Sequence, residues 1–532
     1  MLSYRKLAMR VLGRPLHTGG IDSPRPASQR AAAFILTAAM LITLAAPAFA
    51  DIWHIENGDI SVKASGTKGK NTVSQGNKKD VEDTNTIITG TSDKNTVTID
   101  TSKGNVDVTF DDLNIDTSSR NKAAVSVTGE GDTNIKLDGD NALKSDIYRS
   151  GIYGSGSGSL TISGGENDSL TAQGGSGANG ISSSGSLTIS GGTVTANGDD
   201  GGRGISSSGS VTISGGSTVT ANGGSGTISG GDGIWSGGGV TISGGSTVTA
   251  NGGNGGSLVG GDGIRSGGGL TVSDGTVTAK GGNGDSKDGY GGDGIRSGGV
   301  VTISGNTVNA AGGYGGKVGG YGICSFDRVA ISGGTVEAAG GNGSTGGGSG
   351  IYSSVIDLSG SLELTAKAGS PTGKALSQKG SELDLDTIKD KLGPGAKVTT
   401  TDANGKTKEV SSPRPVEPEE SSSSSDGGSA APSAPASPLP GLTVTDKDGQ
   451  RISYTSTQSG NTLTVCVGRF TASFRISLAA LRQLRAEGIE TITFQTVLCS
   501  TTLSVDELLA MGGEDAEAVL THRFTDSSLT VG

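Results

Sequence analysis

Residues 230–253 read GGDGIWSGGGVTISGGSTVTANGG, and ten of these 24 residues are glycine. The stretch is one unit of a repeat. Aligned on its Gly-Ile pairs, the chain has isoleucine at positions 152, 181, 205, 234, 264, 295, 323 and 351, at intervals of 24 to 31 residues. Each unit runs from GI-x-S through VTISGG or LTISGG and TVTANGG to a glycine-rich insert of varying length. A near-constant period of this size predicts a stack of similar structural units.

The alternation of side chains within each unit predicts short strands. In VTIS and TVTA, Val240, Ile242, Val248 and Ala250 fall on one face, and threonines fall on the other. Segments this short, interrupted by Gly-Gly, do not form helices. Three short strands per unit predict an all-β fold, a right-handed parallel β-helix, in which each coil buries its inward residues against the next coil.

Three inward ladders follow from this alignment. One contains the isoleucines of the Gly-Ile pairs, and the others contain Ile189, Ile213, Ile242, Val272, Ile303 and Ile331, and Val194, Val219, Val248, Val277, Val308 and Val336. Glycine suits the corners, which need positive φ and close backbone approach. At about 4.8 Å per coil, the seven steps from Ile152 to Ile351 predict a rod of roughly 35 Å.

The rest of the chain divides by composition. We expect a signal peptide (1–50), irregular β-helix coils (51–150), the regular repeats (151–370), an end cap (371–410), a disordered Pro/Ser linker (411–440) and a small α+β domain (441–532). Trp53 and Ile55 are expected to close the N-terminal end of the β-helix. SELDLDTIKDKLG is expected to form a short helix that covers its C-terminal strand edges.

The N-terminal segment predicts export. Basic residues precede the apolar run AAAFILTAAMLITLAAPAFA, and Ala48 and Ala50 fit the small-residue rule for cleavage before Asp51. The alternative is a retained membrane anchor, because twenty apolar residues are long enough to span a bilayer. We expect cleavage, no integral membrane segment afterwards, and a secreted or cell-surface protein.

The charge balance excludes two kinds of partner. The formal net charge is −11, and residues 1–50 hold six basic residues and only one acidic residue, so the exported chain is more acidic still. Nucleic acid and anionic membranes require clustered Lys and Arg, so we expect neither partner.

Histidine and cysteine are scarce. Only His54 and His522 follow the signal segment, so Ser or Cys catalytic triads would lack a base, and we expect a non-catalytic protein. Cys324 lies within the repeats, where it is expected to act as a small apolar side chain. Cys466 and Cys499 lie on expected strands of the last domain, where they are either paired or buried as free thiols.

Two columns beside the isoleucine ladder carry the candidate binding residues. Asp232, Asp262 and Asp293 stand two residues before the isoleucine; Tyr153, Trp235, Arg265, Arg296 and Tyr352 stand one residue after it. Residues flanking an inward side chain point outward, so both columns are expected on one solvent face. Aromatic rings and Arg suit binding of an acidic sugar polymer, and the Asp column suits Ca²⁺. The alternative is structural, with Asp as a turn residue that neutralises the Arg.

A further column passes through the TVTAN segments. Gln173, Asn197, Asn222, Asn251 and Lys280 occupy equivalent positions. Stacked Asn side chains bond from coil to coil, so this column is expected to be structural.

The block VDVTFDDLNIDTSSRNKAAVSVTGEGDTNIKLDGDNALKS, followed by repeated SLTISGGTVTANGG, resembles secreted bacterial β-helix proteins described as carbohydrate-binding-domain-containing, relatives of the pectate-lyase-like superfamily. The resemblance covers most of residues 55–370. It implies binding of acidic polysaccharide, with calcium, at or near the cell surface. The alternatives are an adhesin-like stalk that presents the C-terminal domain, and a polysaccharide lyase that uses acidic Ca²⁺ ligands with Arg as base. The monotonous repeat argues against a lyase centre.

Overall fold

The chain divides into two compact units, residues 1–417 and residues 418–532. The computed structural model describes residues 51–412, 441–446, 451–452, 454–459, 461–467, 471–496, 500–512, 516–522 and 527–531. The predicted signal peptide and all but two residues of the predicted linker lie outside the described residues. Within the described residues, no helix is long and apolar enough to cross a membrane.

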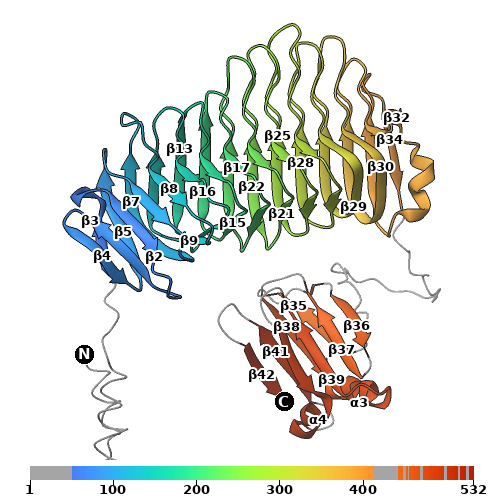
Figure 1. The fold of residues 1–532 in the computed structure, drawn as a ribbon. Helices are drawn as coiled ribbons and strands as arrows, with labels where there is room; N and C mark the ends of the chain where they lie inside the picture. The colour runs from blue at the N-terminus through green and yellow to red at the C-terminus, as the bar shows by residue number, and fades with distance from the viewer. Residues whose placement is uncertain are drawn as a thin grey trace, which may run out of the picture. The chain divides into compact units, whose positions relative to one another are not determined.

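The first unit is a parallel β-helix, as predicted (Figure 1). Its coils stack in register, isoleucine on isoleucine, from Ile152 on Ile181 to Ile323 on Ile351. The first strands of the coils are β8 (Val125–Thr128), β11 (Ile152–Gly154), β14 (Ile181–Ser183), β17 (Ile205–Ser207), β20 (Ile234–Ser236), β23 (Ile264–Ser266) and β26 (Ile295–Ser297). The second strands are β9 (Thr133–Asp138), β12 (Leu160–Ser163), β15 (Leu187–Ser190), β18 (Val211–Ser214), β21 (Val240–Ile242), β24 (Leu270–Val272) and β27 (Val301–Ile303). The third strands are β10 (Asp140–Lys144), β13 (Ser169–Ser176), β16 (Thr193–Asp199), β19 (Thr218–Asn222), β22 (Ser246–Asn251), β25 (Gly275–Lys280) and β28 (Thr307–Ala311). The last coils run through the long strands β29 (Ile323–Ala339) and β30 (Ile351–Lys367).

The core contains the three predicted ladders, whose members are all 0 or 1% exposed. Burial of each Ile or Val side chain contributes about 1.5 to 3 kcal/mol. The serines of the GI-x-S segments are also buried, and from Ser207 to Ser353 their hydroxyls donate to a carbonyl of the preceding coil. Ser236 Oγ lies 2.9 Å from Gly209 O, and Ser266 Oγ lies 3.0 Å from Gly238 O. These bonds satisfy the buried hydroxyls and explain why the segment keeps serine.

Glycine serves two purposes in the coils. Between β21 and β22, Gly244 and Gly245 have φ values of +64° and +72°, which confirms the predicted corner role. In the inserts, glycine is required by close packing of one backbone on another. A Cβ at Gly261 would lie 1.9 Å from the carbonyl oxygen of Gly231. The inserts therefore tolerate no side chain at such positions.

The glycine-rich inserts form an ordered layer, which the sequence did not predict. We call residues 223–231, 252–261, 281–292, 312–320 and 340–348 the insert layer; they form the tall loops above the strands in Figure 1. Single parallel bridges join each insert to the next, as at Gly226 and Gly255. Gly261 N donates to Gly253 O within one insert, and Gly282 N donates to Gly261 O across two inserts, both at 2.8 Å. The layer is thus held by backbone hydrogen bonds.

The N-terminal end is closed partly as predicted. Trp53 and Ile55, from β1 (Ile52–His54) and η1 (Ile55–Asn57), are buried, and Trp53 Nε1 donates to Asp83 Oδ2 at 2.8 Å. One expectation is wrong, because residues 71–83 do not form a coil. Strands β2 (Ile60–Ala64), β3 (Asn71–Gln75) and β4 (Lys78–Asp83) pair antiparallel. Between β3 and β4, Gly76, with φ +55°, allows a two-residue hairpin turn. The first coils are completed by β5 (Thr86–Ser92), β6 (Val97–Asp100) and β7 (Val106–Asp116).

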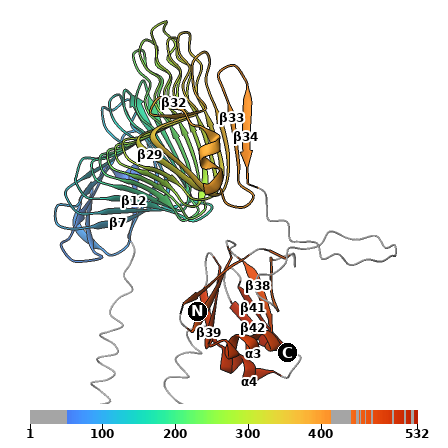
Figure 2. The ribbon, with the colours of Figure 1, turned by 90° about the vertical axis from the view of Figure 1, so that its right-hand side faces the viewer.

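The C-terminal end of the β-helix carries the predicted short helix, a 3-10 helix η2 (Leu385–Lys391) (Figure 2). Leu385 and Ile388 of this helix are buried against the last coil. Beside it lie β31 (Leu376–Gln378), β32 (Ser381–Glu382), β33 (Lys397–Thr401) and β34 (Thr407–Ser411). Strand β33 pairs with β30 and then with the antiparallel β34, so the last coil is covered.

The second unit is the predicted small α+β domain. Its described strands form two sheets, with the orders β35-β38-β41-β42 and β36-β37-β39-β40. The elements are β35 (Leu442–Thr445), β36 (Thr455–Ser459), β37 (Thr462–Cys466), β38 (Ala472–Ser477), α3 (Leu478–Ala486), β39 (Thr491–Gln495), β40 (Ser500–Ser504), α4 (Val505–Met511), β41 (Glu517–His522) and β42 (Ser527–Val531). Ser504 caps α4, because its hydroxyl accepts the backbone N–H of Glu507. Cys466 is a half-buried free thiol, and Cys499 lies outside the described residues.

Candidate ligand-binding groove

The strand register confirms the predicted column one residue after each isoleucine. Its successive members, which we call the first-strand column, are Tyr153, Ser182, Ser206, Trp235, Arg265, Arg296, Cys324 and Tyr352. Tyr153 is 44% exposed, and the side chain of Arg265 is 49% exposed. Cys324 is buried in this column next to Arg296. Burial, followed by the nearby Asp293, raises the pKa of the Cys324 thiol to about 12.

The predicted exposure of the Asp column is wrong. Asp232, Asp262 and Asp293 are only 6, 6 and 3% exposed. Each Oδ1 accepts the backbone N–H of the equivalent residue in the next coil: Asp262 N to Asp232 at 2.9 Å, Asp293 N to Asp262 at 2.7 Å, and Tyr321 N to Asp293 at 2.7 Å. The aspartates lie where the insert layer joins the first strands. They therefore fit the alternative in which Asp is a structural residue that pairs with Arg.

Three arginines pair unequally with these carboxylates. Arg203 Nε lies 3.2 Å from Asp232 Oδ2, and Arg296 Nε lies 2.8 Å from Asp293 Oδ2. Asp262 is held more loosely, since its Oδ2 lies 3.5 Å from Arg296 Nε and 4.0 Å from Arg265 Nη1. Arg265 therefore has the weakest carboxylate contact of the three.

Burial sets the protonation of these acids. It raises the pKa of Asp262 to about 8, helped by repulsion from Asp293 and Asp232 and opposed by Arg296. Burial also raises the pKa of Asp293, against the attraction of Arg296. Burial alone would lower the pKa of Arg296, but pairing with Asp293 and Asp262 outweighs it and raises the value. Arg296 thus stays charged while Asp262 holds a proton up to mildly alkaline pH.

These groups line a groove of about 730 Å³ that crosses five coils. One side is formed by Arg203, Arg265 and Arg296, and the other by insert residues that include Val259, Tyr290 and Val318. Aromatic rings back two of the arginines. The Arg203 guanidinium carbon lies 4.6 Å from the centroid of the Trp235 ring, and that of Arg296 lies 5.6 Å from the Phe326 ring. The groove therefore crosses several coils and is lined by arginines and by Tyr290 and Tyr321.

The groove offers little to a metal ion. No group of three or more His, Cys, Asp or Glu side chains among the described residues is arranged to hold one. In the Asp column, one oxygen of each carboxylate accepts a backbone N–H and the other faces an arginine. Arg265 can act differently. Its guanidinium is half exposed and is free to pair with an anion that enters the groove.

The sequence prediction missed several residues of the groove. Arg203 occupies the position of the Asp column one coil before Asp232, and alignment of GGRGI with GGDGI shows this. Tyr290 and Tyr321, which also line the groove, lie in or beside the insert layer. No signal was available for them, because the inserts had no predicted structure.

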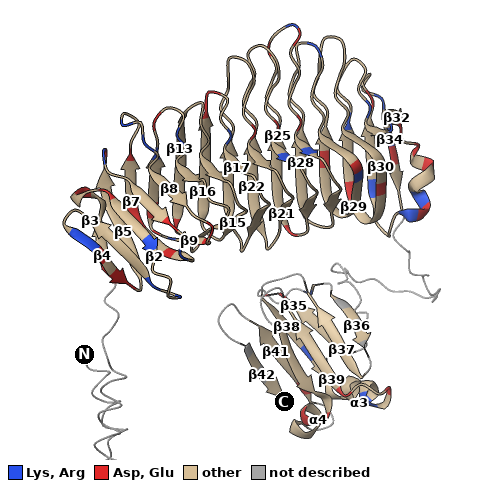
Figure 3. Ribbon diagram, in the orientation of Figure 1, with Lys and Arg blue, Asp and Glu red and all other residues tan. Residues whose placement is uncertain are grey.

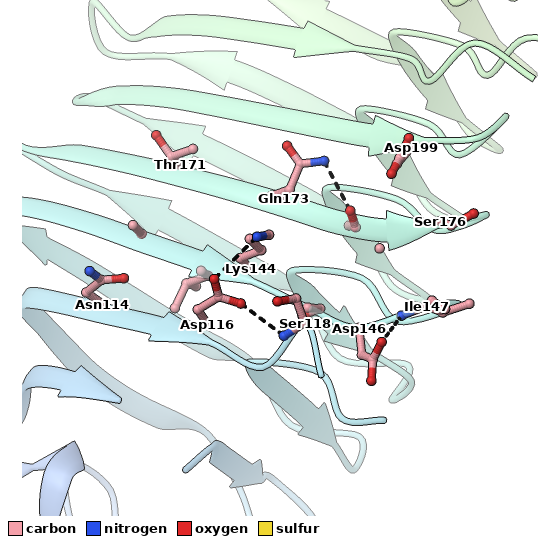
Figure 4. Close-up of a pocket in the computed structure, with 15 residues that line it drawn as sticks. Asn114, Asp116, Ser118, Lys144, Asp146, Ile147, Thr171, Gln173, Ser176 and Asp199 are labelled. Atoms are coloured by element: carbon pink, nitrogen blue, oxygen red, sulfur yellow. Dashed lines mark hydrogen bonds and ion pairs between the residues drawn. The ribbon is translucent and has the colours of Figure 1, made fainter. Parts of the chain in front are cut away.

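A separate hollow of about 630 Å³ lies beside the third strands (Figure 4). Its charged lining residues are Asp116, Lys144, Asp146 and Asp199. Asp116 Oδ2 pairs with Lys144 Nζ at 3.3 Å, and Asp146 Oδ1 accepts Ile147 N at 2.7 Å. The hollow is negatively charged, so it does not suit an anionic ligand.

The chain matches no protein-family model, no curated protein and no solved structure. Evidence for its function therefore comes from the residues of the groove.

Proposed function

We propose that this protein is a secreted or cell-surface, non-catalytic carbohydrate-binding protein, and that its groove binds an acidic polysaccharide. The observation that carries the proposal is the half-exposed guanidinium of Arg265, 4.0 Å from the Asp262 carboxylate, in a groove that crosses five coils. An Arg fork pairs with a carboxylate through two parallel hydrogen bonds, which suits a uronate.

The shape and lining of the groove support a polymer over a small ligand. It runs across successive coils, so equivalent side chains recur at about 4.8 Å intervals along it. Tyr290 is 43% exposed at its edge, and Trp235 is half buried beneath Arg203. Aromatic faces provide apolar contact area for the faces of sugar rings. Charge and ring contacts together fit an extended chain of acidic sugars.

The geometry favours binding over cleavage. A calcium-dependent lyase on this site would need carboxylates available for the metal ion. Here Asp232, Asp262 and Asp293 are buried and engaged with backbone and arginine, so a lyase is the weaker proposal. Calcium enters our proposal only as a condition to be tested.

The test is a binding screen of the exported chain against immobilised neutral and uronic polysaccharides, with calcium and with chelator. We expect retention on uronic polymers, lost when Trp235→Ala and Arg265→Ala are combined. Chelator separates a metal-dependent contact from direct pairing with Arg265. No retention on any glycan would contradict the proposal, leaving the β-helix as a stalk for the C-terminal unit.

A further inference from the structure

A second cleft lies at the N-terminal end of the first-strand column. The column continues from Tyr153 through Ser126, Thr98 and Ser61. All four residues line a hollow of about 570 Å³, which we call the N-terminal cleft. Its other lining residues include Asp59, Gln75, Lys79, Asn121, Lys122 and Arg149. The cleft thus lies along the same column as the groove, and Tyr153 is two coil steps from the coil of Arg203.

The N-terminal cleft carries excess positive charge on an acidic protein. Its lining holds Lys79, Lys122 and Arg149 against a single acid, Asp59. Lys122 Nζ pairs with Asp59 Oδ2 at 3.2 Å, and Lys79 and Arg149 form no ion pair with any described residue. Both are exposed. The whole chain has a formal net charge of −11, so two unpaired cations in one hollow form a local site for an anion.

Tyr153 gives the N-terminal cleft an aromatic surface. Its ring is 44% exposed, although its neighbours in the column, Ser126 and Ser182, are small. A Tyr ring beside Lys and Arg is the same combination that Trp235 and Arg203 provide in the groove. Tyr153 and Trp235 hold equivalent positions of the repeat, so the two hollows combine an aromatic ring from the same column with nearby cations.

We propose that the N-terminal cleft is a second subsite for the same acidic polysaccharide. This inference rests on the proposed function of the groove. From Tyr153 to Arg296 the column takes five coil steps, or roughly 24 Å at the usual strand spacing. The small side chains of Ser182 and Ser206 lie between the subsites in the column. A long uronate chain contacts both subsites at once, and a short one contacts only one.

The experiment measures the affinity of the exported chain for oligogalacturonides from the dimer to the dodecamer. Linked subsites raise affinity through effective concentration, so we expect affinity to rise steeply once an oligomer spans both. The double variant Lys79→Ala with Arg149→Ala is expected to weaken binding of the dodecamer at least tenfold. It is expected to leave the affinity of an oligomer held in the groove within about twofold.

A matched control removes two exposed lysines from other strands, Lys136 of β9 and Lys280 of β25. The Lys136→Ala with Lys280→Ala variant has the same net charge as the cleft variant, and it is expected to retain the affinity for the dodecamer. If the cleft variant also binds the dodecamer like the unchanged protein, while Arg265→Ala does not, the second subsite is refuted and the groove remains. If no oligomer binds the unchanged protein, the proposed function itself fails.

Discussion

The outward columns on the third strands and on the first strands of the β-helix have equally regular backbones, but their side chains are very different. On the third strands, Thr193, Thr218, Thr247, Thr276 and Thr307 stack in register. Strands β18 to β22 carry no charged residue (Figure 3). The first-strand column is also in register, but its side chain changes from coil to coil. Its members include Trp235, Arg265 and Arg296.

The comparison shows what the fold itself requires. The threonine column lies on the outer surface of the third strands. A β-branched residue repeated in each coil is sufficient there, because it favours strand structure and packs against the threonines of the neighbouring coils. The first-strand column lies beside the insert layer, which buries the aspartates and forms the groove. The register alone does not demand Trp or Arg there, because Ser182 and Ser206 occupy the same position in other coils. Arg296 also has a structural contact, because it pairs with the buried Asp293. We therefore propose that Trp235 and Arg265 in this column serve ligand binding.

The largest expected effect is on the insert layer. Gly261→Ala places a Cβ 1.9 Å from the carbonyl oxygen of Gly231, so the backbone must move. We expect a loss of about 3 kcal/mol or more of unfolding free energy and loss of uronate binding, measured by chemical denaturation and calorimetry. Gly346→Ala, in the same layer, is the control, because its Cβ would lie 3.4 Å from Val318 Cγ2. Equal effects of the two variants would show that the layer is not tightly packed.

The second prediction separates the two faces by binding. Arg265→Ala removes the available guanidinium and is expected to weaken uronate binding by about 10- to 100-fold, the usual worth of a charged hydrogen bond. Thr247→Ala, exposed on β22, is the control and is expected to change affinity less than twofold. Isothermal titration with one oligogalacturonide measures both. Equal loss in the two variants would contradict the assignment of binding to the groove.

The third prediction concerns pH. Because the folded state raises the pKa of Asp262 to about 8, it binds this proton more tightly than the unfolded chain does. The stability that this provides is complete at low pH and is lost as pH rises toward 8. We expect the β-helix to lose up to about 3 kcal/mol between pH 6 and pH 8 through this group.

Asp262→Asn tests this dependence, since the amide keeps an oxygen for the N–H of Asp293 but does not ionise. Denaturation curves at pH 6 and pH 8 are expected to differ less for the variant than for the unchanged protein. Asp138→Asn, at an exposed position on β9, is expected to keep the full difference. A pH dependence that persists in Asp262→Asn would refute the role of this carboxyl.

The smallest effect is expected in the amide column. As predicted from the sequence, Asn222 Nδ2 donates to Asn197 Oδ1 and Asn251 Nδ2 donates to Asn222 Oδ1, both at 2.8 Å. Asn222→Ala breaks both bonds and is expected to cost about 1 kcal/mol of unfolding free energy. Binding of uronate should not change, because this column lies on the third strands. A loss of affinity comparable to that of Arg265→Ala would place ligand contacts on that face as well.

The sequence predicted the strands and the core of the β-helix, but it did not predict the ordered insert layer. The alternation around Ile242 and Val248 identifies inward positions because each strand is amphipathic. The inserts show no alternation, and their order comes from backbone hydrogen bonds such as Gly282 N to Gly261 O. Without that layer, nothing in the sequence indicated that Asp262 is buried. The column of Trp235 and Arg265 was predictable because it depends only on register.

The most direct test of the central claim compares two forms of one polymer, polygalacturonate and its methyl ester, which differ in carboxylate charge and share the same sugar backbone. Equilibrium binding of the exported chain is measured for both at low and high salt. We predict binding of the free acid that weakens with salt, and at least tenfold weaker binding of the ester. Equal affinity for the two forms, or binding of neither, would contradict recognition of an acidic polysaccharide through Arg265 and its neighbours.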